Sequence, residues 1–279
     1  MHKPQRWKKI RPAHLPAVKT FLLDREPFCV GACSRFLTGY NHAWAFRNLR
    51  GDIVAFLLHS RLSLYPVFSA NPSLPLPKFF SRFLHNIPIH AVQGLKEDAE
   101  ILEEGMEGLG CPAVEKIDYD LMTLDKEPPS ECFQQGPPDL VLRKPTAEDI
   151  EGLYLLHAAY EQEEVIPRCG EFNPAVCRKT LEKLLASQQI LTACLGGEIV
   201  GKINTNAVSF NRFQIGGVYV KPEYRGRSIA IRMSAFFFKE LLSACSGLNL
   251  FVKKHNTAAR KLYHRLGFVT KGDYRISYF

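Results

Sequence analysis

A short turn of glycine, arginine and serine, Arg225–Ser228 (RGRS), has the composition of an anion-binding segment. It follows an apolar stretch that ends at Val220, and Pro222 prevents that strand from continuing. The residues after the turn have a helical pattern, so the turn would present unpaired N–H groups at the positive end of a helix dipole. Such a terminus binds phosphate or pyrophosphate, and Gly226 permits a close approach of the backbone to a ligand.

A second candidate site lies on the next predicted helix. Asn256 and Tyr263 are seven residues apart, which places both on one face of a helix that begins near Thr257 and ends at Gly267. A tyrosine hydroxyl in a pocket can act as a general acid. The alternative role for Tyr263 is that of a core residue at helical spacing.

Together these two segments resemble the GNAT superfamily of acyl-CoA-dependent N-acyltransferases. The pyrophosphate loop of that family, R/Q-x-x-G-x-G/A, is similar to Arg225–Ala230, although Ser228 stands where the family usually has glycine. The family's second pattern, N-x-x-A-x-x-x-Y-x-x-x-G-F, is met at Asn256, Ala259, Tyr263, Gly267 and Phe268.

The resemblance implies acetyl-CoA or a related acyl-CoA as co-substrate, no metal, and direct transfer of the acyl group to a small-molecule or peptide amine. Backbone groups of Val218 and Val220 would pair with the pantetheine arm. Asn256 would contact the cofactor, and Tyr263 would protonate the departing CoA thiolate. The residues that would hold the pyrophosphate are Arg225, Gly226, Arg227, Ser228, Ile229 and Ala230.

The base that deprotonates the amine is predicted from a run of glutamates, Glu161, Glu163 and Glu164. They follow the first helix of the C-terminal half, where GNAT proteins often build the acceptor wall, and Glu164 is the first choice. Glu223 and His255, near the predicted cofactor loop, are alternatives. The run could also be no more than a solvated, charged face.

The C-terminal half alternates predicted strands and helices in an order typical of an α/β or α+β domain with a mixed sheet. Thr146, followed by an acidic residue three positions later, predicts a helix cap. Gly196-Gly197 predicts a hairpin turn. We expect strands at 140–143, 190–195, 198–207, 214–220, 248–252 and 268–279, and helices through 153–160, after Asn173-Pro174, at 228–243 and at 257–266.

A proline-rich stretch, Lys126–Asp139 (KEPPSECFQQGPPD), is predicted as a linker between domains 1–125 and 140–279. The first domain weakly repeats the plan of the second: a helix is expected from His14, and residues 48–55 have the pattern of a strand, a tight turn and a strand.

The two-part layout resembles bacterial tandem proteins in which a degenerate GNAT-like half precedes a catalytic GNAT half. It implies two tandem domains, each a mixed, mostly antiparallel sheet flanked by helices. The first half has no R-x-x-G-x-G/A equivalent, so we do not expect it to bind CoA. It could hold the acceptor or cover one edge of the catalytic sheet.

The chain of 279 residues has a net charge of +8, which favours anionic ligands without choosing among them. The eight cysteines form no CxxC pair, which indicates a reducing cytoplasm, and Cys29 and Cys33 would share one helix face as buried thiols. The nine histidines show no HExxH or finger spacing, so no dedicated metal site is expected. No apolar run approaches about 20 residues, so no membrane span is expected.

Two other functions compete with catalysis of amine acylation. Ser228 and the lack of an obvious base are compatible with a non-catalytic acyl-CoA sensor. The basic charge and pairs such as Lys8–Lys9 and Lys253–Lys254 are compatible with an acyltransferase that associates with RNA or the ribosome. The sequence makes no prediction of the oligomeric state.

Overall fold

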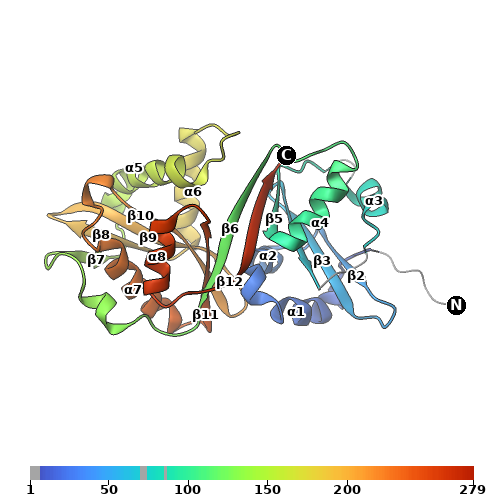
Figure 1. The fold of residues 1–279 in the computed structure, drawn as a ribbon, viewed down its shortest axis with the longest axis horizontal. Coiled ribbons are helices and arrows are strands. Elements are labelled where there is room, and N and C mark those ends of the chain that lie inside the picture. The colour runs from blue at the N-terminus through green and yellow to red at the C-terminus, as the bar shows by residue number, and fades with distance from the viewer. Residues whose placement is uncertain (1–6, 70–73, 85–86) are drawn as a thin grey trace. The chain divides into compact units, whose positions relative to one another are not determined.

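The structure is a computed structural model that describes residues 7–69, 74–84 and 87–279 (Figure 1). The chain forms two compact units, the first Met1–Leu121 together with Lys271–Phe279, and the second Met122–Thr270. Among the described residues, no helix combines the length and the apolar character needed to cross a bilayer.

The first unit is built on a mixed sheet that is mostly antiparallel. The predicted strand, tight turn and strand over 48–55 are confirmed, since β2 and β3 are joined by a turn in which Gly51 has φ 94°. Only β4 and β5 pair in parallel among the register pairs described for this unit. The strand order is β1 (Lys8–Lys9), β2 (Ala43–Arg47), β3 (Ile53–Ser60), β4 (Ser63–Phe68), β5 (Ala91–Leu95) and β12 (Val269–Tyr278).

Helices and aromatic side chains complete the core of the first unit. Trp7, Trp44 and Phe79 pack together there, with ring centroids 4.7 Å apart for Trp7 and Phe79. Cys29 and Cys33 are both buried on one face of α2 with their Sγ atoms 3.5 Å apart, as predicted. The helices of this unit are α1 (Leu15–Leu23), α2 (Glu26–Thr38), α3 (Leu76–Phe79) and α4 (Lys96–Glu107), and strand β6 (Glu115–Leu124) follows α4.

The end of the chain belongs to the first unit, whereas the predicted C-terminal domain ran to residue 279. Strand β12 pairs antiparallel with β5, with Tyr274 opposite Leu95. Arg275 donates to Asp118 Oδ1 at 2.6 Å and holds the pKa of that carboxyl down to about 2. The strand is assigned to this unit by hydrogen-bond partners far away in the sequence, which local patterns do not reveal.

The second unit has the mixed sheet and flanking helices that the sequence predicts. Thr146 forms a capping box with Asp149, whose Oδ2 accepts the Thr146 N–H at 2.6 Å. Gly196 and Gly197 have φ 56° and 85°, as a tight hairpin turn requires. The strands, in sheet order, are β11 (Gly247–Lys253), β10 (Arg212–Val220), β9 (Glu198–Val208), β8 (Ile190–Leu195) and β7 (Val141–Arg143), and the helices are α5 (Ile150–Tyr160), α6 (Pro174–Ser187), α7 (Ile229–Leu242) and α8 (Thr257–Arg265).

Helices cover both faces of this second sheet. Ile199 packs with Leu156 of α5, while its neighbour Val200 belongs to the cluster that α7 buries. Adjacent residues of a strand point to opposite faces, so α5 and α7 lie on opposite sides of the sheet.

The predicted linker, 126–139, is a packed part of the second unit. It contains a short 3-10 helix, Ser130–Gln134, in which Cys132 is buried and Phe133 makes an edge contact with Phe236 of α7. Arg232 of α7 donates to the Pro137 carbonyl at 2.9 Å. Prolines stop regular elements, but they do not stop a segment from packing.

Candidate functional site

A pocket opens where two neighbouring strands of the second unit separate. Within the described residues, the parallel pairing of β10 with β11 is confined to Arg212–Gln214 and Gly247–Asn249. Beyond it, β10 is irregular between Gly216 and Tyr219. The pocket at this opening has a volume of about 430 Å³ and is lined by β10, the start of α7, α8 and the π-helical turn Glu161–Val165, here η5.

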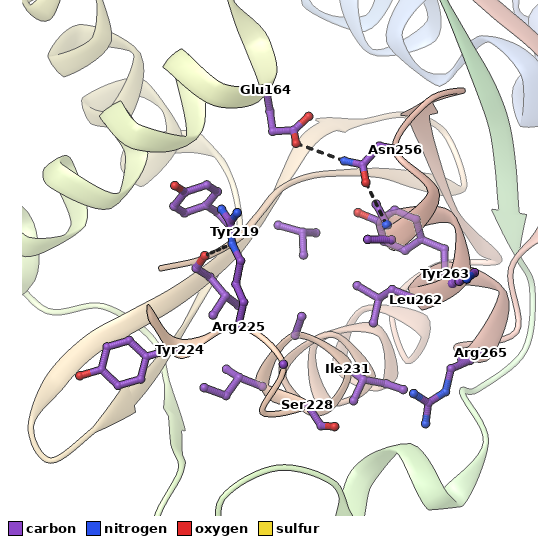
Figure 2. A pocket seen from close by; sticks show the side chains of 18 of the residues that line it. Glu164, Tyr219, Tyr224, Arg225, Ser228, Ile231, Asn256, Leu262, Tyr263 and Arg265 are labelled. Atoms are coloured by element: carbon purple, nitrogen blue, oxygen red, sulfur yellow. Dashed lines mark hydrogen bonds between the residues drawn. The ribbon is translucent and has the colours of Figure 1, made fainter. Parts of the chain in front are cut away.

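The structure places all but one of the predicted site residues on this pocket (Figure 2). The exception is Arg227, which is exposed and has its guanidinium carbon 5.4 Å from the Tyr224 ring centroid. The residues that line the pocket are Glu164, Val218, Val220, Arg225, Gly226, Ser228, Ile229, Ala230, Asn256 and Tyr263. Their roles in binding and catalysis stay predictions.

The turn before α7 has the backbone geometry of an anion site. Gly226 has φ 78°, and α7 begins at Ile229, so the first N–H groups of that helix have no intrahelical partner. Ser228 has φ 57° and ψ 18°, a left-handed conformation that costs a non-glycine residue roughly 1–2 kcal/mol. The departure from glycine at this position therefore places strain within the loop itself.

Replacing Ser228 with glycine should remove this strain. We expect the free energy of unfolding to rise by about 0.5–1 kcal/mol, because the relief of strain exceeds the extra entropy of glycine in the unfolded chain. Chemical denaturation measures the change. Ser243→Gly is the matched control, since Ser243 caps the other end of α7 at φ −68° and should lose stability. A loss in both variants would contradict strain at Ser228.

Arg225 is held by groups on either side of it. Its Nη2 donates to Glu163 Oε2 at 2.8 Å, and its Nε donates to the Val220 carbonyl at 3.0 Å. The Arg225 guanidinium holds the pKa of Glu163 below its ordinary value, and Tyr219 donates a second hydrogen bond to the same carboxylate oxygen at 2.9 Å. Glu163 is thus engaged as a partner of Arg225, whereas Glu164 Oε2 lies 3.9 Å from Lys253 Nζ and has no bond to Arg225 among the described contacts.

Glu164, Asn256 and Tyr263 meet at the far side of the pocket from the turn (Figure 2). Asn256 caps α8 through Oδ1, which accepts the Ala259 N–H at 3.0 Å, and its Nδ2 donates to Glu164 Oε1 at 3.1 Å. Tyr263 is buried, and burial raises its pKa, so the hydroxyl holds its proton at neutral pH. A proton donor, the Tyr263 hydroxyl, and a carboxylate, that of Glu164, therefore both line this side of the pocket.

Two basic residues of α8 also line the pocket and were missed by the sequence reasoning. Lys261 and Arg265 are four residues apart, so they project from one face of the helix. Arg265 donates to Gln135 Oε1 at 3.0 Å. The i, i+4 spacing of these two cations, a few residues after Asn256, is the sequence signal that could have identified them as pocket residues. They extend the positive charge that begins at the turn.

The bulge in β10 depends on Gly217, which has φ 60°. Its N–H donates to the Tyr160 hydroxyl at 3.3 Å, and its carbonyl accepts from Lys202 Nζ at 3.2 Å. A Cβ at this position would lie 1.8 Å from Asn204 Oδ1, so no other residue fits without rearrangement. Two adjacent glycines inside an apolar strand are a bulge signal that the sequence carried.

Comparisons with known proteins agree with this geometry. The model of the acetyltransferase (GNAT) family matches residues 150–268. A GCN5-related N-acetyltransferase from Sphaerobacter thermophilus is similar in structure, with a TM-score of 0.61 and 18% identity over 98% of this chain and 94% of that one. A tandem GNAT protein from the clavulanic acid biosynthesis pathway gives a TM-score of 0.60 and 11% identity over 99% and 98%. A Drosophila protein gives 0.65 and 15% over 99% of each chain. No curated protein matches the chain.

Residues 150–268 match the model of the acetyltransferase (GNAT) family, and the chain as a whole has the fold of tandem GNAT structures. The predicted fold class is thereby confirmed.

Proposed function

We propose that the protein is an acyl-CoA-dependent N-acyltransferase that transfers an acetyl group from acetyl-CoA to the amine of a small molecule or peptide. The observation that carries this proposal is one pocket that combines three features: the edge of β10 beyond its pairing with β11, a helix N-terminus, and both Tyr263 and Glu164 in its lining.

Binding would use the backbone more than the side chains. Beyond its pairing with β11, the edge of β10 at Val218 and Val220 would offer backbone groups to the amides of the pantetheine arm, with the Val220 carbonyl shared with Arg225 Nε. The first turn of α7 offers N–H groups to the pyrophosphate, with Arg225 and Arg227 adding positive charge. A bound pyrophosphate would compete with Glu163 for Arg225, because the Glu163 carboxylate is already ion-paired with the Arg225 guanidinium.

The chemistry follows from the two groups at the far side. Glu164 accepts a proton from the bound ammonium group, and the neutral nitrogen then attacks the thioester carbon directly. The new N–C bond forms, the C–S bond breaks, and the departing thiolate takes the hydroxyl proton of Tyr263. The extra proton on the new amide nitrogen passes to the Tyr263 phenolate, which restores the phenol. Because burial raises the pKa of Tyr263, the phenol stays protonated until negative charge develops on sulfur.

Thermal unfolding with and without acetyl-CoA tests the binding step. A ligand present at about 100 times its dissociation constant stabilises the folded state by about 2.7 kcal/mol, which shifts the melting temperature by roughly 5–10 °C. We expect this shift in the wild type and its loss in the double variant Arg225→Ala/Arg227→Ala.

A matched control is Lys144→Ala/Lys239→Ala, which removes two positive charges beside exposed glutamates and should keep the shift. No shift at millimolar acetyl-CoA would exclude acetyl-CoA as the ligand. With binding established, release of free CoA in the presence of an amine panel distinguishes an enzyme from a sensor, because a sensor releases none.

A further inference from the structure

A buried polar cluster lies outside the pocket, between α5, η5, α6 and β9. It consists of His157, Glu161 and Cys177, with Lys202 beside them. His157 is 2% exposed and Cys177 is fully buried, while the Glu161 side chain is 14% exposed. The proposed acyl transfer makes no use of these side chains, so their burial needs another explanation.

The histidine lacks the hydrogen bonds that a buried imidazole needs. His157 Nε2 lies 3.3 Å from Glu161 Oε1, close enough for an ion pair when the ring is protonated, but within the described part of the chain neither ring nitrogen has a hydrogen-bond partner. A buried polar group without a partner costs roughly 1–3 kcal/mol. That cost is avoided when the nitrogen binds a ligand that the protein atoms do not include.

The donor set matches a metal ion. One ligand atom from each of His157, Glu161 and Cys177 lies within 4.8 Å of the other two. Zinc bonds nitrogen, sulfur and oxygen at about 2.0–2.3 Å, so tetrahedral ligands lie roughly 3.5 Å apart. The His157 Nε2 to Glu161 Oε1 distance of 3.3 Å already matches such a separation, and the Cys177 Sγ lies within 4.8 Å of both other residues' ligand atoms.

The charges near the cluster are compatible with a cation. The Glu161 carboxylate and a Cys177 thiolate would balance a divalent ion. Lys202 faces the same space, but its Nζ donates to Asn204 Oδ1 at 3.1 Å and to the Gly217 carbonyl, and burial lowers its pKa to about 7. Two of the Lys202 N–H groups are therefore engaged by atoms outside the His157, Glu161 and Cys177 set. Without a metal, burial raises the pKa of Cys177 to about 12, so the thiol stays protonated.

We propose that His157, Glu161 and Cys177 form a binding site for a divalent transition-metal ion of the zinc type, with one coordination position left to a water or another ligand. His157 and Glu161 come from α5 and the start of η5, and Cys177 comes from α6. The ion would tie α6 to the turn that carries Glu163 and Glu164 to the pocket. Its role is to hold that turn in place, and it does not depend on the identity of the acyl donor.

Cobalt absorption tests the site on the full chain after removal of metals with a chelator. We expect Co²⁺ alone, added without acetyl-CoA, to give a thiolate-to-cobalt charge-transfer band and the visible bands of a tetrahedral ion. The bands should saturate at one equivalent and bleach when Zn²⁺ is added. No absorption at millimolar Co²⁺ would overturn the proposal.

Variants locate the ion. Cys177→Ser should abolish the charge-transfer band, whereas Cys132→Ser, a matched buried thiol elsewhere in the second unit, should keep it. A band that survives Cys177→Ser would overturn the site, since the exposed Cys111 or Cys169 would then be the ligand. If Cys177→Ser does not fold, the melting temperatures of His157→Asn and the wild type are compared with and without metal. Zn²⁺, but not Mg²⁺, should raise the melting temperature of the wild type only, and the absence of that rise would contradict the proposal.

Discussion

Replacing Tyr263 with phenylalanine should lower the turnover number by about 100- to 10,000-fold and leave the affinity for acetyl-CoA nearly unchanged. The ring packs against Phe268 with centroids 5.8 Å apart, and phenylalanine keeps that contact. The variant therefore removes only the proton donor. Its loss should slow the step in which the thiolate departs and should not change the binding of acetyl-CoA. Single-turnover kinetics measure the rate, and calorimetric titration measures the affinity.

The control for this experiment is Tyr224→Phe, which also removes one hydroxyl from a residue that lines the pocket. The Tyr224 hydroxyl donates to Glu198 Oε2 at 2.7 Å and lies outside the group of Tyr263 and Glu164. Its loss should change turnover little. Equal losses of turnover and affinity in Tyr263→Phe would show that Tyr263 shapes the binding site and would contradict its role as the acid.

Replacing Glu164 with glutamine should lower kcat/KM for the amine by about 100-fold or more, with acetyl-CoA affinity again retained. Glutamine is isosteric, and its carbonyl oxygen can still accept the hydrogen bond from Asn256 Nδ2. The cap of α8 is preserved, so the variant separates a chemical role of the carboxylate from a positional one. The measurement is the initial rate of CoA release as the amine concentration varies.

Glu163→Gln is the control for the Glu164→Gln experiment. Glu163 neighbours Glu164 in sequence but is bound to Arg225 and Tyr219. Its replacement should act on acetyl-CoA binding, through Arg225, more than on the amine step. A large loss of turnover in Glu163→Gln with little change in Glu164→Gln would move the role of base to Glu163 and contradict our assignment.

The turn at Arg225–Ser228 and the helix that follows Asn256 could be predicted because their geometry is local. A strand that ends at Val220, a glycine turn and a helix start are encoded within neighbouring residues, and Asn256 caps the helix whose third residue is Ala259. The spacing of Asn256 and Tyr263 follows from helical periodicity alone. The sequence shows that Ser228 stands where the family pattern has glycine, but its left-handed backbone conformation appears only in the structure.

Long-range partners could not be predicted in this way. The bond from Asn256 to Glu164 joins residues far apart in the chain, and so does the pairing of β12 with β5, which places the last strand in the first unit. A sequence pattern indicates which residues are apolar or need a hydrogen-bond partner. It does not indicate which distant residue becomes that partner.

The sequence by itself thus determined the resemblance to the GNAT family, the alternation of strands and helices, and the two motifs of the pocket, because backbone propensity and capping act between neighbours. The tertiary structure alone decided which glutamate bonds Asn256, which groups hold the Gly217 bulge, and that His157 lies beside Cys177. Those contacts join elements that are distant in the sequence, and their packing is set by the whole core and not by any one segment.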